Sequence, residues 1–140
     1  RAWKKGDQIE IVLPMHIEAE PMPGKSPYVA LLNGPILLAA KTDSTNLTGL
    51  FADDSRMGHI ASGTQYPLQD MPMFVSNQTN YASQVYPAKG KSQTFKASNL
   101  IYPAAKKNLE LIPFYKLHDS RYVVYWQTVN EAGLKTMKET

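Results

Sequence analysis

The sequence predicts an all-β fold, an antiparallel β-sandwich of the jelly-roll kind. Short runs of aliphatic and aromatic residues recur along the 140 residues, and clusters of Gly, Pro, Asn and Asp separate them. No stretch shows the 3.6-residue apolar period of a long helix. The length suits one hydrophobic core. We therefore expect a single domain over residues 1–140, with one long irregular loop over residues 42–71.

The first two predicted strands rest on alternation. Apolar and polar residues alternate over residues 8–13 and again over residues 15–20, which predicts strands with one buried face each. Pro14 lies between them and removes a ladder donor, which indicates an edge or a bend.

Two continuous apolar runs follow, at residues 28–32 and 36–41, and they predict central strands. Asn33-Gly34-Pro35 connects them. An Asn-Gly pair is typical of a tight hairpin, whereas the following proline also fits a bulge within one long strand. Both interpretations stay open from the sequence.

Periodicity is lost between residue 42 and about residue 71. Loops of this length are uncommon inside compact domains, and they tend to be functional or to pack on a neighbour. Asp53 could begin a one-turn helix there. Beyond the loop, short strands are predicted at residues 72–76, 83–86 and 92–97, and the polar tail after Asn130 either frays or forms a short helix.

The stretch from residue 109 to residue 126 organises the rest of the chain. Two runs of aromatic and aliphatic residues flank His118-Asp119-Ser120, which predicts a β-hairpin with Asp119 in its turn. Neither run alternates cleanly, and a strand that is apolar on both faces expects cover on both faces. We expect one face to join the core and the other to dock on a neighbour outside this chain.

Composition excludes several classes of function. The chain has no cysteine, so it has no disulfide, no thiolate nucleophile and no cysteine zinc site. The net charge of +3 comes from scattered lysines without an aromatic-studded basic stripe, so we expect no nucleic-acid partner. The apolar runs are too short to span a membrane. The chain opens on Arg1 rather than Met, which predicts a piece excised from a longer protein.

His118, Asp119 and Arg121 form the sharpest candidate for chemistry. A histidine oriented by a carboxylate can act as acid and base near neutral pH. Neighbours on an extended chain, however, point to opposite sides. We favour a structural interpretation, in which Asp119 makes the turn and Arg121 ties it down by a charge-assisted bond.

Asp53, Asp54 and His59 could supply ligands to a metal ion. Their spacing matches no calcium-binding loop, which needs alternating oxygen ligands and a distal Glu. Helix capping and surface ion pairs explain them better, and no cofactor is expected.

Glycoside chemistry would need two acids about 5–10 Å apart across a cleft. The acids on predicted strands are Glu10, Glu18, Glu20 and Glu110, and none is marked out. Sugar binding without catalysis could use exposed rings, for which Trp3, Trp126 and tyrosines such as Tyr122 are available. Aromatic residues in strands more often belong to the core.

Four segments resemble one protein family. They are residues 3–15, which contain Trp3-x-x-Gly6-Asp7, and residues 29–39, 49–61 and 113–126. Together they are similar to the region that follows the catalytic barrel in glycoside hydrolase family 127, the β-L-arabinofuranosidase-like proteins. The last two segments are similar to one bacterial branch of it. The resemblance extends over nearly the whole chain.

The resemblance implies a non-catalytic role. Enzymes of this family place catalysis in an (α/α)6 barrel, with a cysteine nucleophile held near zinc by further cysteines and a glutamate. This chain has no cysteine and no room for the barrel, so none of those residues carries over. We expect an accessory β-sandwich that supports the barrel of its parent chain, a glycoside hydrolase acting on plant or complex glycans in the periplasm or at the cell surface. The alternatives are an independent carbohydrate-binding module that uses exposed aromatics, and a protein-interaction domain.

Overall fold

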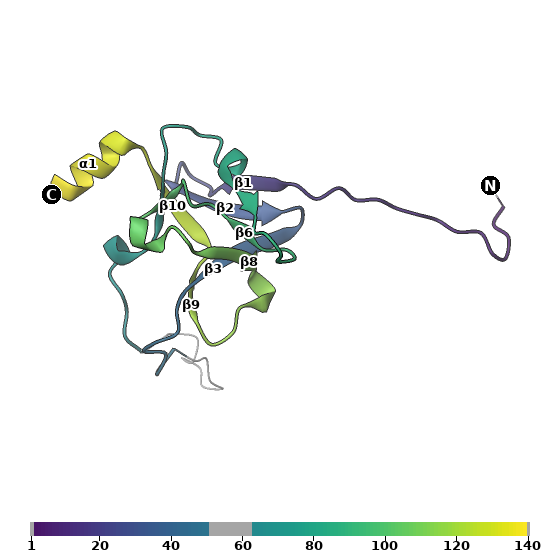
Figure 1. Cartoon of the computed structure of the whole chain (residues 1–140), viewed down its shortest axis with the longest axis horizontal. Helices are drawn as coiled ribbons and strands as arrows, with labels where there is room; N and C mark the ends of the chain where they lie inside the picture. Colours follow the sequence, from purple (N-terminus) through teal and green to yellow (C-terminus); the bar gives the residue numbers. More distant parts are fainter. Residues whose placement is uncertain (1, 51–62, 140) are drawn as a thin grey trace.

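The structure is a computed structural model, and it describes residues 2–50 and 63–139. Within these residues ten strands join in one large mixed sheet, followed by a short C-terminal helix (Figure 1). The predicted all-β, sandwich-like class is confirmed. The strands are β1 (Ile17–Pro21), β2 (Tyr28–Asn33), β3 (Ile36–Asp43), β4 (Met73–Val75), β5 (Tyr86–Pro87), β6 (Phe95–Lys96), β7 (Ile101–Tyr102), β8 (Glu110–Pro113), β9 (Arg121–Val123) and β10 (Tyr125–Val129), and the helix is α1 (Glu131–Glu139).

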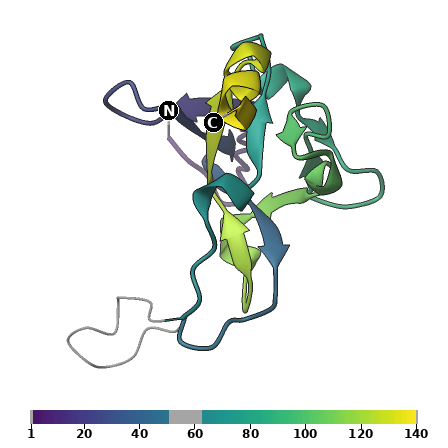
Figure 2. The ribbon, with the colours of Figure 1, turned by 90° about the vertical axis from the view of Figure 1, so that its left-hand side faces the viewer.

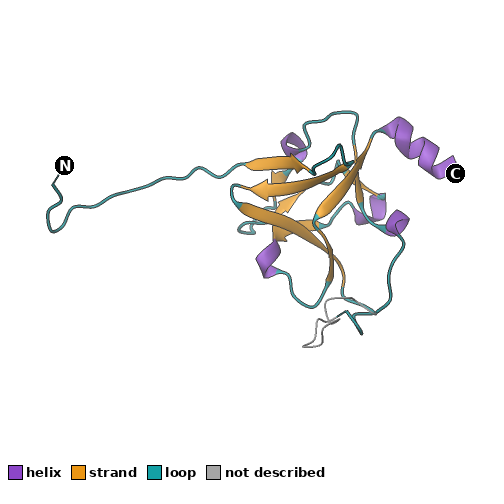
Figure 3. Ribbon diagram, turned by 180° about the vertical axis from the view of Figure 1, so that it is seen from behind, coloured by secondary structure: helices purple, strands orange, loops and turns teal. Residues whose placement is uncertain are grey.

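Four single-turn 3-10 helices connect the strands and surround the sheet together with α1 (Figure 3). They are η1 (Leu68–Asp70), η2 (Ala82–Gln84), η3 (Ala104–Lys106) and η4 (Phe114–Lys116). Three of the four follow a proline, whose fixed φ and missing N–H suit the start of a helical turn.

The β2–β3 hairpin forms the centre of the sheet. Asn33 pairs with Ile36, so Gly34 and Pro35 make a tight two-residue turn and the bulged-strand interpretation is wrong. Gly34 has a φ of +57°, which the first central position of such a turn requires. The ring of Pro35 fixes the negative φ that fits the second position.

The hairpin opens away from its turn, and a later segment enters the gap. One edge of β2 pairs with β1. Along the other edge the partner of β2 changes, from β3 at Leu31 to β10 at Ala30. Likewise, one edge of β3 pairs with β8. Along the other edge the partner of β3 changes, from β2 at Leu38 to β9 from Ala40 onward. The β9–β10 segment therefore lies between the diverging ends of β2 and β3.

The sheet extends from this centre in both directions and closes over one core. On one side β10 pairs in parallel with β4, which pairs with β7. On the other side β8, β6 and β5 follow β3. Every one of these strands except β5 and β6 contributes buried residues to a single cluster, the largest of which are Trp126, Phe74, Leu31, Leu38, Leu100 and Leu111. The one parallel pair departs from the wholly antiparallel sandwich that we expected.

Trp126 and Phe74 form the middle of the core. Both side chains are 0% exposed, and their rings stack with centroids 4.4 Å apart and planes 7° apart. Burial of each ring contributes about 1.5–3 kcal/mol, and a stacked pair adds about 0.5–1.5 kcal/mol. This contact joins β10 to its parallel partner β4.

Several predicted strands are placed differently. Residues 8–13 form no strand, and the strand expected at residues 15–20 begins at Ile17. Of residues 83–86, Ser83 and Gln84 lie in the η2 turn and Tyr86 begins β5. The turn forms because Tyr81 and Ala82 accept backbone hydrogen bonds from Gln84 and Val85. The strand expected at 92–97 shortens to β6. The strand at 72–76 and the short C-terminal helix are confirmed.

The stretch from residue 109 to residue 126 is not a hairpin. Both β8 and β9 pair with β3, on its opposite edges, instead of with each other. Pro113 ends the first strand, and the η4 turn then carries the chain across β3. The physical reason is the length of β3, which has eight residues: it extends beyond its pairing with β2, so β9 can pair on that edge while β8 pairs on the other.

Candidate functional site

The first surface that could serve a function is an extended N-terminal arm, residues 2–16, which runs away from the sheet (Figure 1). Its alternating side chains Ile9, Ile11 and Leu13 are 66%, 75% and 78% exposed. No strand of the described chain pairs with the arm. The sequence of the arm has the alternation of a half-buried strand, but no described residue buries its apolar side chains.

The end of the arm contacts the β2–β3 hairpin. The thioether of Met15 lies where a side chain on Gly34 would stand. The Gly34 N–H donates to the carbonyl oxygen of His16 at 2.9 Å, just before β1 begins. Gly34 is thus needed both for its left-handed backbone and for the close approach of Met15.

A second exposed surface, the aromatic face, consists of Phe114, Tyr122 and Tyr125 together with Leu37 and Met71. These residues line a shallow hollow of about 450 Å³. The three rings are 39%, 47% and 52% exposed. The neighbouring residues Leu111, Val123 and Trp126 point into the core. Residues 109–126 therefore have one side in the core and aromatic side chains in solvent on the other.

Arg121 makes a clamp at the lower end of the sheet, where β3 and β9 lie side by side (Figure 2). Its Nη2 donates to the carbonyl oxygens of Asn46 and Thr64, each at 2.7 Å, and its Nε donates to that of Thr45 at 3.3 Å. The guanidinium carbon lies 3.9 Å from the ring centroid of Tyr66. Arg121 therefore ties together two segments of the long loop, and it does not bind Asp119.

Asp43 stands opposite Arg121 in the β3–β9 register and completes this clamp. Its carboxylate accepts hydrogen bonds from the Thr45 hydroxyl at 2.6 Å, from the Thr45 and Ser44 amides at 2.9 and 2.7 Å, and from the Tyr66 hydroxyl at 3.1 Å. These bonds, those from Thr45 above all, lower the pKa of Asp43 from 3.8 to about 2. Its acceptor capacity is largely used within its own turn.

Sequence reasoning named Arg121 but missed Asp43 and Tyr66. A signal was present in Asp43-Ser44-Thr45, because an aspartate followed by small hydroxyl residues is typical of a turn in which the side chain binds the backbone two residues on. Nothing in the sequence pointed to Tyr66 as the partner across the loop.

His118 and Asp119 do not form a catalytic pair. Both are exposed, and no hydrogen bond joins their side chains to each other or to another described residue. Asp119 has a φ of +45°, the left-handed conformation that aspartate tolerates in turns. Asp119 thus lies in a bend between η4 and β9, and not in the hairpin turn that the sequence predicted.

The other acids considered above lie on the arm and on the strands β1 and β8, and Glu18 and Glu20 share one face of β1. Glu10 is on the arm, Glu18 lies 2.7 Å from His16 at the start of β1, and Glu110 on β8 accepts from the Lys91 ammonium at 2.6 Å. Asp53, Asp54 and His59 lie outside the described residues, as does the helical turn expected at Asp53. Over residues 2–50 and 63–139, no group of three His, Asp or Glu side chains could hold a metal ion.

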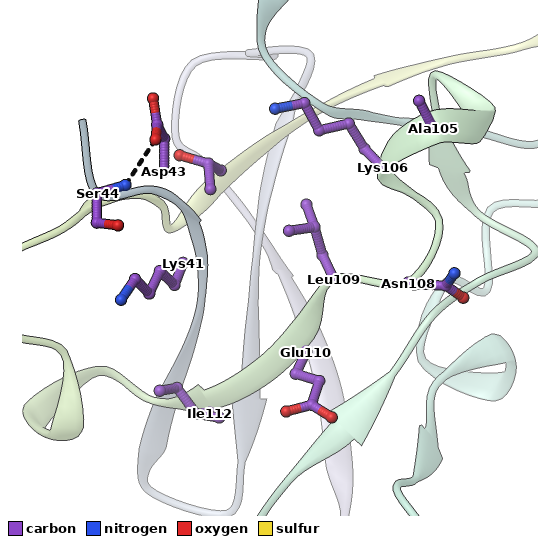
Figure 4. A pocket seen from close by; sticks show the side chains of 10 residues that line it. Lys41, Asp43, Ser44, Ala105, Lys106, Asn108, Leu109, Glu110 and Ile112 are labelled. Carbon is purple, nitrogen blue, oxygen red and sulfur yellow. Dashed lines mark hydrogen bonds between the residues drawn. The ribbon is translucent and has the colours of Figure 1, made fainter. Parts of the chain in front are cut away.

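An open groove of about 700 Å³ lies between the end of β3 and the segment that leads into β8 (Figure 4). Lys41 and Lys106 stand on its two sides, and Asn108, Leu109 and Glu110 continue its lining. Polar and apolar groups are mixed, so the groove is wet and shallow compared with the enclosed pockets that hold small cofactors.

In the described part of the chain, no helix has the length and apolar character needed to cross a membrane.

Comparison with known protein families gives one finding. Residues 18–128 match the model of DUF4986, a domain of unknown function. The match begins within β1 and ends within β10, so it contains nearly the whole sheet and leaves out the arm and α1. No curated protein matches the chain.

Proposed function

The chain belongs to the DUF4986 family, and we propose that it is a non-catalytic accessory domain of a β-L-arabinofuranosidase-like glycoside hydrolase, packed against the helical barrel of its parent chain. The observation that carries the proposal is the apolar arm, whose side chains are patterned for burial and yet are 66–78% exposed. The resemblance of residues 3–15 to the segment that follows such a barrel supplies the partner. The resemblance likewise suggests a parent that is exported to the periplasm or the cell surface.

The energetics favour a covered arm. Full burial of one Ile or Leu side chain contributes about 1.5–3 kcal/mol. Because Ile9, Ile11 and Leu13 keep between two thirds and four fifths of their surface exposed, an apolar partner would gain roughly 3–6 kcal/mol from them before ordering costs. Gln8, Glu10 and Val12 lie on the other side of the alternation, and the two polar side chains among them would remain in water.

A helical surface suits the arm better than an added strand. Strand addition depends on main-chain hydrogen bonds along an unbroken ladder. Pro14 has no N–H to donate, and the Lys4–Asp7 turn ends the extended part at its other side. Side-chain packing of Ile9, Ile11 and Leu13 into the grooves of helices needs no such ladder.

The aromatic face would provide a second contact with the barrel. Rings with a polar tip are common at interfaces, because the body of the ring is buried while the hydroxyl stays at the wet rim. Tyr122 and Tyr125 have this form, and Phe114 lies beside them without a polar tip. We expect Phe114 to be the most deeply buried of the three in the parent protein.

A carbohydrate-binding module that stacks sugars on this aromatic face has less support. Such a platform needs exposed rings in one plane. The rings of Phe114 and Tyr122 are tilted by 58°, and Trp126, the largest ring of the stretch, is 0% exposed. Trp3 is 61% exposed, but it belongs to the arm, which runs away from the sheet (Figure 1).

One substitution tests the role of the arm. Ile11→Lys should leave the thermal unfolding of this chain unchanged within about 1 °C, because the side chain is already 75% exposed. In the parent protein it should lower the free energy of unfolding by about 1–3 kcal/mol, since a charged group would replace a buried one. Gln8→Lys is the matched control and should leave the stability of both this chain and the parent protein unchanged. Equal effects of Ile11→Lys in the two proteins would contradict the proposal.

A second experiment tests the absence of catalysis. The pure chain should not hydrolyse aryl arabinosides, because His118 and Asp119 are not paired and no cysteine is present. Clear turnover that is lost on His118→Ala would overturn the non-catalytic assignment.

A further inference from the structure

Lysines are scattered along the whole chain, but the excess of positive over negative charge lies in one part of the sequence. Residues 71–118 contain six lysines and one acidic residue, Glu110. The rest of the chain has a slight excess of acidic residues, although the whole carries +3. An uneven distribution of this kind creates a local field even when the net charge is small.

Strand pairing brings part of this charge onto one face of the sheet. Tyr86 on β5 pairs with Lys96 on β6, and Lys96 pairs with Glu110 on β8. Side chains of directly paired residues stand on the same face, so the three form a row. They line a hollow of about 650 Å³ together with Lys89 and Lys91 from the turn between β5 and β6.

The groove of Figure 4 continues this surface, because Glu110 lines both hollows. In that view the Lys106 side chain extends from η3 across the groove, and Lys41 lies on the β3 side. We call the combined surface the lysine face, and define it by Lys41, Lys89, Lys91, Lys96 and Lys106.

Four of the five lysines on the lysine face form no ion pair with a described residue. Of its carboxylates, Glu110 is paired with Lys91 at 2.6 Å, and Asp43 is held by its own turn. Among the described residues, Lys41, Lys89, Lys96 and Lys106 form no ion pair. A ligand would therefore meet four ammonium groups whose charge is not neutralised by the protein.

We propose that the lysine face binds an acidic polysaccharide through the carboxylates of its uronic acid units. The choice of a glycan rests on the proposed function, and three features of the surface fit it. The Tyr86 ring is 43% exposed and could cover a sugar face. Thr42, Ser44 and Asn108 offer neutral hydrogen-bonding groups along the groove. Lysine ammonium groups act as point charges toward carboxylates.

A nucleic acid fits this surface less well. Phosphate recognition favours the planar fork of arginine, and single strands favour several stacked aromatic rings. The residues that line the two hollows include no arginine and a single aromatic ring, Tyr86.

Calorimetric titration with polygalacturonate tests the proposal, with neutral linear arabinan as the comparison. We expect binding of polygalacturonate at low salt, at least tenfold weaker binding at 0.5 M salt because screening shortens the reach of charges to a few ångströms, and no binding of arabinan. The double variant Lys89→Gln/Lys96→Gln should bind at least tenfold more weakly, and so should Lys41→Gln/Lys106→Gln.

The matched control is Lys25→Gln/Lys135→Gln, which removes the same charge away from the lysine face and should change affinity less than twofold. Three results would overturn the proposal: no binding of polygalacturonate, an equal loss in the control variant, or equal binding of duplex DNA. Each double variant is checked first by circular dichroism, and the two independent pairs keep the test valid if one misfolds. Failure here leaves the Ile11→Lys result untouched, so the two proposals fail separately.

Discussion

Replacing Arg121 by alanine should destabilise the base of the long loop by about 3–4 kcal/mol. Two short hydrogen bonds, to the carbonyl oxygens of Asn46 and Thr64 at 2.7 Å, carry most of this. A hydrogen bond from a charged group contributes about 1.5–3 kcal/mol net, and the half-exposed position of Arg121 argues for the lower end of that range. The contact with the Tyr66 ring adds about 0.5–1 kcal/mol.

Lysine at position 121 separates charge from geometry. The lysine side chain ends one bond short of Nη2, so its ammonium could keep one of the two short bonds, and it lacks both the Nε donor to Thr45 and the planar group over the Tyr66 ring. We therefore expect Arg121→Lys to lose about half as much stability as Arg121→Ala. If the clamp acted by charge alone, Arg121→Lys would match the original protein.

Two measurements follow the effect. Urea unfolding gives the global free energy, and a loss of about 3 kcal/mol corresponds to a fall in Tm of roughly 10 °C for a chain of this size. Hydrogen exchange reports local opening of residues 44–50 and 63–66, which should exchange faster in the variants. A change below about 0.5 kcal/mol in Arg121→Ala, with unchanged exchange in these segments, would refute the clamp.

Two further predictions concern the sheet. The pKa of Asp43 is lower in the folded chain, about 2 against 3.8, so its ionised form stabilises the fold above pH about 4, and this contribution is lost as the pH falls through 2. In acid titrations of unfolding, the difference in stability between the original protein and Asp43→Asn should therefore shrink between pH 4 and pH 2, and a constant difference would contradict this. Trp126→Ala should cost about 3–5 kcal/mol by urea unfolding, because the side chain is 0% exposed and stacked on Phe74. A loss below about 1 kcal/mol would show that the core does not depend on this contact.

Local patterns were enough to predict the centre of the sheet. The apolar runs at residues 28–32 and 36–41 became β2 and β3, and Gly34-Pro35 became their turn. In each case the signal and the structure depend on the same few residues: buried strands need continuous apolar side chains, and a tight turn needs a residue with positive φ.

Pairing over long distances could not be predicted in the same way. Residues 109–126 look like a hairpin because two apolar runs flank a turn, yet each run finds β3 instead, some seventy to eighty residues earlier in the chain. Which edge of which strand is free depends on the whole topology, and no local pattern encodes it.

The clamp at Arg121 and the N-terminal arm show two further features that the sequence alone does not predict. Arg121 was recognised, but its partners are backbone carbonyls of Thr45, Asn46 and Thr64, and every residue has such a carbonyl. The alternation of residues 8–13 predicted a half-buried strand, but these residues form no strand and their apolar side chains are exposed. Alternation does not reveal whether the covering surface belongs to the same chain, and here the described residues do not supply it.

Hydrogen exchange of residues 8–13, measured in this chain alone and in the parent protein, tests the central claim most directly. In the isolated chain these amides should exchange at nearly the rate of an unfolded peptide, because the arm has no strand partner. In the parent protein the side chains of Ile9, Ile11 and Leu13 should become protected from hydroxyl-radical labelling, and the amides of the arm that the barrel shields from water should exchange more slowly than in the isolated chain. Equal exchange and equal labelling of the arm in both proteins would contradict the account.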